Sequence, residues 1–320
     1  MPIVDMSLEE LKLYRGTNPK PKDFDSFWQD AMNEMNTVDP QTEMVLSDFK
    51  TSFADCFDMY FTGVKNARIH AKLLIPKQLE KPAPAVLHFH GYTGDSGDWM
   101  DKLPYVAEGF IVAALDCRGQ GGKSEDTGGI KGNTFRGHII RGIDDDKQNM
   151  LMRNIYLDTA QTAKIIMNLP EVDEGRVGVM GGSQGGGLSL VCASLVPQIK
   201  KVAVMYPFLS DYKRGWDMDL DQSAYEELRT YFRQFDPLHE REGEIFEKLG
   251  YLDVHHLAPR IQADVLMAIT LMDTVCPPST QFAAFNNITS SKRAEIYPDY
   301  GHEVLPRFND HAFSFLKSGG

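Results

Sequence analysis

A short segment in the middle of the chain constrains its fold most strongly. An apolar run at 177–180, typical of a buried strand, leads into the glycine-rich turn Gly181–Gly185, and an apolar helical pattern follows from Leu188. Ser183 lies at the apex of this turn, with glycine two positions away on each side. A strand, a tight turn and a helix in this order form a nucleophile elbow, in which only small residues fit beside the serine. We therefore predict that Ser183 is a catalytic nucleophile.

A serine hydroxyl is a weak nucleophile at neutral pH, so Ser183 needs a base and a group that orients the base. In hydrolases with such an elbow the chain order is serine, acid, histidine, with the acid and the histidine in loops after late strands. Only His302 among the later histidines follows a strand-like segment, at 293–297, and we expect it to open the final helix. We predict His302 as the base. Of the remaining downstream histidines, His239 and His311 are expected to be exposed to solvent. His255 and His256 are expected either to contact the substrate or to serve as a structural cap.

The acid is predicted from the same order. A buried strand at 264–271 runs directly into Asp273, and open α/β sheets place functional side chains at the carboxyl ends of their strands. Two competitors are weaker: Asp299 is too close in sequence to His302, and Asp211 follows an earlier strand. Helix capping explains both of those residues. We predict Asp273 as the residue that orients His302.

Acyl transfer also needs N–H donors directed at the developing oxyanion. The backbone N–H of Gln184, the first residue of the helix after the elbow, is one predicted donor. An earlier strand, at 84–89, is followed by His90 and Gly91, which match the start of the His-Gly loop that esterases use. We therefore predict the backbone N–H of Tyr92 as the second oxyanion donor. We expect the Tyr92 side chain to wall the acyl pocket, and His90 to have a structural role.

The rest of the chain alternates between strand-like and helical segments. Continuous Val-, Ile- and Leu-rich strands indicate a mostly parallel sheet covered by helices on both faces, so we predict an α/β-hydrolase fold. The clearest helical pattern covers 152–167, with apolar residues spaced by three and four. Segments 44–50 and 53–62 are expected as antiparallel edge strands, and 7–14 as a short capped helix. The expected strands of the main sheet are 67–75, 85–89, 110–115, 177–180, 202–206, 265–271 and 293–297.

The continuous alternation of strand-like and helical segments favours a single α/β-hydrolase domain over residues 1–320, with an N-terminal helical extension at 1–40. Two segments interrupt it. Residues 119–146 form a glycine-rich, charged connection of a length usually found in functional loops. Residues 208–257 form an insertion near the active-site face. One interpretation is that this insertion covers the pocket or contacts another subunit. The other is that it is a surface pair of helices with aromatic core residues.

Composition excludes several classes of partner. A formal net charge of −12 disfavours nucleic acid and anionic membranes. No apolar run approaches the roughly 20 residues that span a bilayer, and residues 1–6 lack the features of a signal peptide, so we expect a cytoplasmic protein. The four cysteines are scattered and mostly within apolar segments, which indicates free buried thiols. No zinc-type spacing or phosphate loop is present, so we expect no metal and no cofactor.

Three motifs in order resemble a known family. Arg118–Gln120, Gly181–Gly185 and the pair at 302–303, with Asp273 in the expected loop, resemble the signature of carbohydrate esterase family 7, which contains acetyl xylan esterases and cephalosporin C deacetylases. The segment 13–28 resembles the leader of the same family, so the similarity covers essentially the whole chain. Arg118 itself is expected to pair with a carboxylate, either as a loop anchor or facing substrate.

The resemblance implies an acetyl esterase that acts on acetylated xylo-oligosaccharides and other small acetate esters such as cephalosporin C. It also implies a homohexamer with active sites facing an inner cavity. Three alternatives remain open from the residues alone: a general short-chain carboxylesterase, a serine peptidase of the prolyl-oligopeptidase kind, and an inactive α/β-hydrolase that serves as a binding protein. The peptidase is disfavoured because the chain has no repeats from which a propeller domain could be built.

Overall fold

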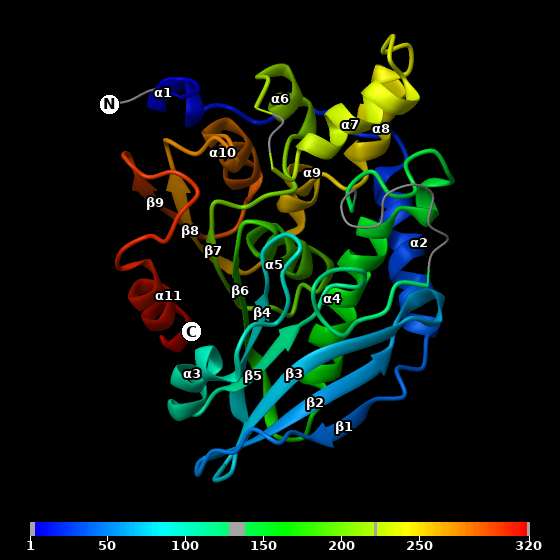
Figure 1. Ribbon diagram of the computed structural model, residues 1–320. Helices are drawn as coiled ribbons and strands as arrows, with labels where there is room; N and C mark the ends of the chain where they lie inside the picture. Colours follow the sequence, from blue (N-terminus) through cyan, green and yellow to red (C-terminus); the bar gives the residue numbers. More distant parts are fainter. Residues whose placement is uncertain (1–3, 128–137, 221–222, 319–320) are drawn as a thin grey trace.

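A nine-stranded sheet organises the part of the chain that the computed structural model describes, residues 4–127, 138–220 and 223–318 (Figure 1). The strand order is β1-β2-β3-β5-β4-β6-β7-β8-β9. The pairs β1–β2, β2–β3 and β3–β5 are antiparallel, and every other neighbouring pair is parallel. The predicted mostly parallel sheet with antiparallel strands at one edge is therefore confirmed.

The strands and helices have the following bounds. The strands are β1 Glu43–Leu46, β2 Ala54–Thr62, β3 Arg68–Pro76, β4 Ala83–Phe89, β5 Ile111–Leu115, β6 Val172–Gly182, β7 Lys201–Met205, β8 Asp264–Thr270 and β9 Lys292–Tyr297. The helices are α1 Leu8–Leu11, α2 Phe24–Thr37, α3 Leu103–Ala107, α4 Leu151–Met167, α5 Gln184–Leu195, α6 Tyr212–Asp217, α7 Glu226–Phe235, α8 Glu242–Gly250, α9 Val254–Leu257, α10 Pro278–Asn287 and α11 Phe308–Lys317. None of these described helices is both long and apolar enough to pass through a bilayer.

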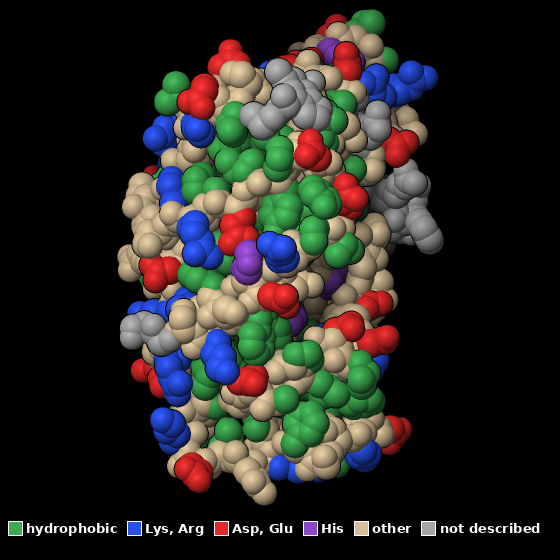
Figure 2. All heavy atoms as spheres, turned by 90° about the vertical axis from the view of Figure 1, so that its left-hand side faces the viewer, with side chains coloured by type: hydrophobic (Ala, Val, Ile, Leu, Met, Phe, Trp, Pro, Cys, Tyr) green, Lys and Arg blue, Asp and Glu red, His purple; other side chains and the backbone are tan. Residues whose placement is uncertain are grey.

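Helices cover both faces of the sheet. On one face α4 and α5 pack against the central strands, and on the other α3 and α11 do so (Figure 1). Every residue of α5 is buried, as expected for a helix that is apolar on all sides. On the side with α3 and α11, Lys and Arg side chains are interspersed with Asp and Glu (Figure 2).

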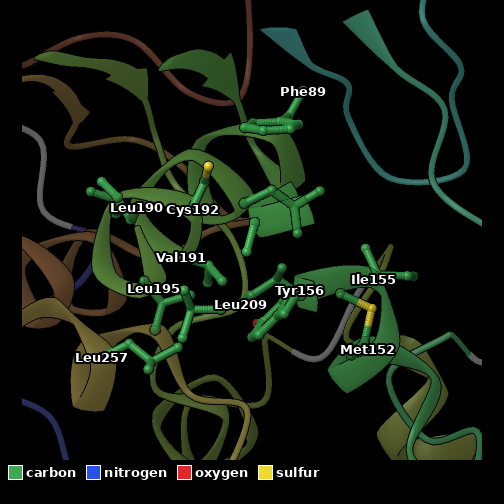
Figure 3. Packing of buried hydrophobic residues seen from close by; sticks show 14 of the residues in the cluster. Phe89, Met152, Ile155, Tyr156, Leu190, Val191, Cys192, Leu195, Leu209 and Leu257 are labelled. Carbon is green, nitrogen blue, oxygen red and sulfur yellow. The ribbon is translucent and has the colours of Figure 1, made fainter. Parts of the chain in front are cut away.

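The core beneath the central strands positions the helix that follows Ser183. Side chains at the predicted spacing on α4, including Ile155 and Tyr156, belong to one buried apolar cluster with Val191 and Leu195 of α5 (Figure 3). A fully buried apolar side chain of this size contributes about 1.5–3 kcal/mol relative to an exposed one. The helix α5, which begins directly after Ser183, is therefore held in place by this buried layer.

Arg118 anchors the loop after β5 to this layer. Its Nε and one terminal nitrogen donate to both carboxylate oxygens of Asp158 on α4, at 2.7 and 2.6 Å, and the other terminal nitrogen donates to the Val64 carbonyl at 3.2 Å. The side chain is 1% exposed. Of the two roles expected for Arg118, the loop anchor is confirmed and the substrate-facing position is wrong.

The N-terminal segment is fixed to the insertion by a buried carboxylate. Asp211 accepts hydrogen bonds from the N–H groups of Thr17 and Asn18, at 3.0 and 2.9 Å, and from the Tyr14 hydroxyl at 2.6 Å. The side chain does not cap the helix that follows it. The interpretation of Asp211 as a capping residue is therefore wrong, because the leader supplies its donors.

His255 belongs to the same buried cluster. Its Nδ1 lies 2.6 Å from Asp253, whose other bonds include the N–H of Asp211 at 2.8 Å. Of the two alternatives for His255, the structural one is confirmed.

A second buried network links β3, β5 and the loop after β4. The Asp116 carboxylate contacts His70 Nδ1 at 2.6 Å and accepts the N–H groups of Ser96 and Lys123, at 2.6 and 2.9 Å. Burial by itself raises the pKa of Asp116, but the hydrogen bonds from His70 and the two N–H groups outweigh it and hold the pKa well below its usual range.

We expect this network to stabilise the protein most above the ordinary aspartate pKa. A carboxyl whose pKa is depressed in the folded state contributes stability that is fully present above the unfolded-state pKa and is lost as the pH falls from there through the folded-state pKa. Asp116→Asn should therefore lower the free energy of unfolding by about 1–3 kcal/mol at pH 7, and by less at about pH 2.5, which is below the unfolded-state pKa of about 3.9. Urea denaturation at both pH values measures this, with the exposed Asp48→Asn as the matched control. A deficit that is the same at both pH values would contradict it.

Candidate active site

The turn that carries Ser183 is strained in the way that a nucleophile elbow requires. Ser183 has φ 54° and ψ −122°, a conformation that residues other than glycine rarely adopt. A Cβ at Gly185 would lie 1.9 Å from the Phe89 carbonyl oxygen, and one at Gly181 would lie 2.5 Å from the backbone of Gly185. Only glycine fits at these two positions, which is why the motif contains it.

Hydrogen bonds to the end of β7 and to the segment that follows it hold this strained residue. The Ser183 N–H donates to the Met205 carbonyl at the end of β7, at 3.1 Å, and the Ser183 carbonyl accepts from the Phe208 N–H at 2.9 Å. The turn therefore lies at the carboxyl end of the parallel strands, where such sheets place their functional groups.

Asp273 and His302 lie together at the same end of the sheet. His302 Nδ1 is 2.8 Å from Asp273 Oδ2, and the other carboxylate oxygen accepts the N–H groups of Val275 and Cys276, each at 2.8 Å. Asp273 is fully buried, whereas the His302 side chain is 23% exposed. This pairing fixes the ring of His302 and leaves its Nε2 available for proton transfer.

The expectation that His302 opens the last helix is wrong. The helix α11 begins at Phe308, because Arg307 adopts the left-handed conformation with φ 67° and Pro306 precedes it. His302 is instead in the loop between β9 and α11, and its ring centroid lies 4.5 Å from that of Tyr206. A loop position is the one that the predicted order of serine, acid and histidine requires.

Cys276 completes the surroundings of Ser183. Its fully buried thiol interacts with the Ser183 hydroxyl, and burial raises the pKa of this thiol well above its usual value. Between Ser183 and His302, both described, the structure has no direct hydrogen bond. In many hydrolases this bond becomes short and well aligned only when substrate is bound.

The two predicted oxyanion donors lie on adjacent segments joined by a pair of side-chain amides. Gln120 and Gln184 exchange hydrogen bonds at 2.9 and 3.0 Å, and Gln120 also accepts the Thr93 N–H at 2.9 Å. Within the described residues, neither the Tyr92 nor the Gln184 N–H donates a hydrogen bond to the chain itself. Both donors are therefore free to bind an oxygen atom.

His90 has the structural role that the sequence predicts. Its Nε2 accepts the Cys117 N–H at 3.0 Å, so the proton is on Nδ1, which donates to the Gly91 carbonyl at 2.7 Å. Burial lowers the pKa of His90, which favours this neutral form.

Glu227 and Gln120 are site residues that the sequence analysis missed. Glu227 accepts a hydrogen bond from the Tyr92 hydroxyl although the two are separated by 135 positions. Since α7 carries several charged residues, nothing in its pattern distinguishes a buried glutamate from a solvated one. For Gln120 a signal was present, because it belongs to one of the three motifs.

The insertion at 208–257 contains α6 to α9 in its described part. Its aromatic side chains form a cluster, with the Trp216 ring 4.8 Å from Phe232 and 6.2 Å from Phe246. The helical and aromatic character expected for this segment is therefore confirmed. Residues 128–137 of the connection at 119–146 lie outside the described residues, so the expectation of a functional loop over 119–146 stays a prediction.

Comparison with known proteins adds three relatives of similar length or longer. The acetyl xylan esterase 1 from Thermoanaerobacterium sp. JW/SL YS485 is 62% identical, with a TM-score of 0.96 and 98% of each chain covered. The acetyl xylan esterase from Paenibacillus sp. R4 is 33% identical, with a TM-score of 0.92 and 98% of this chain and 99% of that chain covered. The acetyl esterase Axe7A from Xylanibacter ruminicola is 30% identical over 326 residues, which cover 98% of this chain and 70% of that protein.

The family to which these relatives point also matches the chain as a whole. The family described as acetyl xylan esterase (AXE1) matches residues 1–318, which includes the leader, the elbow and the loops of Asp273 and His302. With this match over nearly its whole length, the chain belongs to the acetyl xylan esterase family.

Proposed function

We propose that the protein is a serine esterase that removes acetyl groups from small acetate esters through an acyl-enzyme. The observation that carries the proposal is the Asp273–His302 pair at 2.8 Å, at the same end of the sheet as the strained Ser183 turn. Membership of the acetyl xylan esterase family supports the ester and acetyl parts of the proposal.

The proposed reaction has two steps. His302 takes the Ser183 proton while the Ser183 oxygen attacks the acyl carbonyl, and the alcohol leaves with that proton. Water, deprotonated by His302, then attacks the acyl carbonyl; the bond from this carbonyl to the Ser183 oxygen breaks, His302 returns the proton to Ser183, and acetate is released. In both steps the N–H groups of Gln184 and Tyr92 donate to the oxyanion, and Asp273 stabilises the imidazolium.

No metal is part of this proposal, although three ligand-type atoms lie close together. Ligand atoms of Asp273, Cys276 and His302 are within 4.8 Å of one another. The Asp273 oxygens already accept hydrogen bonds from the chain, and the raised pKa of the Cys276 thiol keeps it protonated, whereas metals bind thiolates. The donor set therefore fits proton transfer better than metal binding.

For substrates we infer acetylated xylo-oligosaccharides and, more widely, acetate esters of varied alcohols, including cephalosporin C. Two related structures carry the name acetyl xylan esterase, which supports the first of these. The second comes from the family resemblance alone. We also infer a reducing, cytoplasmic compartment, which is supported by the four cysteines, all of them buried and free.

Acyl selectivity tests the acetyl part of the proposal. Along a series of acetyl, butyryl and octanoyl esters of one alcohol, we expect kcat/KM to fall, by about 10-fold or more at each step, since a pocket closed beyond the methyl group excludes longer chains. Varying the alcohol at constant acetyl should change kcat/KM much less. Initial-rate measurements on 4-nitrophenyl and 4-methylumbelliferyl esters provide both comparisons.

The same assay separates the alternatives. Equal turnover of acetyl, butyryl and octanoyl esters would favour a general carboxylesterase. Faster cleavage of a peptide amide than of any acetate ester would favour the peptidase, and turnover of neither would favour the inactive binding protein.

We further propose that the protein assembles as a homohexamer, as the family resemblance implies. The outer strand β1 supports an interface, because it exposes Met44, Val45 and Leu46 at the edge of the sheet. Light scattering after size exclusion should then give six times the chain mass of 36.0 kDa. A mass equal to one chain would contradict the assembly without affecting the proposed chemistry.

A further inference from the structure

A buried carboxylate from the insertion joins two segments next to the elbow. Glu227, at the start of α7, is 5% exposed, and one of its oxygens accepts the Tyr92 hydroxyl. The other oxygen accepts the N–H groups of Ile139 and Ile140, at 2.8 and 2.9 Å. A buried carboxyl is costly unless such partners are kept in place, so Glu227 holds these segments together.

The Tyr92 ring is held on its other sides as well. It meets the Phe208 ring edge-on, at 5.7 Å between centroids, and the His138 ring at 5.2 Å, while its hydroxyl accepts the His138 N–H at 3.2 Å. The Phe208 N–H in turn bonds to the Ser183 carbonyl at 2.9 Å. The position of the ring relative to Ser183 therefore depends on Glu227, Phe208 and His138 together.

We propose that Glu227 is a positioning residue for acyl selectivity. By holding the Tyr92 hydroxyl it keeps the Tyr92 ring against Phe208, so that the ring closes the acyl side of the site beyond a methyl group. Glu227 itself touches no reacting atom, and its effect passes through Tyr92. The inference rests on the proposed esterase function and gives the insertion a part in choosing the substrate.

The test compares the acetate-to-butyrate ratio of kcat/KM in the full-length protein. Tyr92→Phe, which keeps the ring but removes the hydroxyl, and Glu227→Ala should each lower this ratio by about tenfold. Glu227→Gln, which keeps the size and one acceptor, should restore part of it. Because the two side chains act as one unit, the double variant Tyr92→Phe/Glu227→Ala should lower the ratio no further than the single variants do.

A matched control is Glu247→Gln, which removes one charge from an exposed position on α8 of the same insertion and should leave the ratio unchanged. If Glu227→Ala does not fold, Tyr92→Phe and Glu227→Gln decide the matter. Equal losses of acetate and butyrate hydrolysis would mean a purely structural role and overturn the inference.

The wild-type protein separates this inference from the proposed function. A wild type that favours acetate, with variants that keep the same ratio, overturns the role of Glu227 alone. A wild type that hydrolyses butyrate as fast as acetate overturns the acetyl preference on which that role depends.

Discussion

Replacing Ser183 with alanine should lower kcat for 4-nitrophenyl acetate by about 10⁴ or more while the protein stays folded. His302→Ala should have a comparable effect, since without the base the hydroxyl remains a weak nucleophile. The two side chains act as a unit, so the double variant should be no slower than the slower single variant. Stopped-flow or long initial-rate assays, with circular dichroism as the check on folding, measure these effects.

Covalent labelling provides an independent readout of the same assignment. A fluorophosphonate should add to Ser183 in the wild type and, much more slowly, in His302→Ala, with the adduct located by mass spectrometry. A folded Ser183→Ala protein that keeps a tenth of the wild-type rate would refute the assignment of the nucleophile.

The second large effect concerns stability. Gly185→Ala should destabilise the protein by about 3 kcal/mol or more, because the added Cβ would lie 1.9 Å from the Phe89 carbonyl oxygen, a backbone atom that cannot turn aside as a flexible side chain can. The turn must then open, which separates the oxyanion donors from Ser183 and removes activity as well. Thermal and urea denaturation measure the loss.

Gly243→Ala is the matched control for this substitution. Gly243 lies in α8, and a Cβ there would have nothing within 4 Å. Since alanine favours a helix over glycine, this variant should be more stable by about 0.5–1 kcal/mol. Equal behaviour of the two variants would show that the close contact at Gly185 is not the cause.

The part of the site that could be predicted depends on local rules. Gly181 and Gly185 follow from the space inside one tight turn, and Asp273 and His302 follow from the order of loops along the chain. These rules involve neighbouring residues or whole strands, so a single sequence contains them. The catalytic roles of Ser183 and His302 remain predictions that the variants above test, and the role of Asp273 is a prediction as well.

The residues that were missed depend on contacts between distant segments. Glu227 meets Tyr92 only because the insertion folds back over the loop after β4, and its charged surroundings in sequence resemble those of a solvated residue. The early start of β6 at Val172 was missed for a related reason: residues 173–176 are charged residues and a glycine at the more exposed end of the strand, so the apolar pattern begins only at 177.

The bonds of Asp211 to the leader also affect how the chain folds during synthesis. Thr17 and Asn18 bond to a residue 194 and 193 positions later. Until Asp211 leaves the ribosome, the leader has no native partner at this point, and the partner of another of its anchors, the Tyr251 carbonyl that accepts the Trp28 indole N–H, comes still later. Contacts of such long range slow folding. The leader is translated long before these partners and is therefore among the last of the described segments to reach its final place.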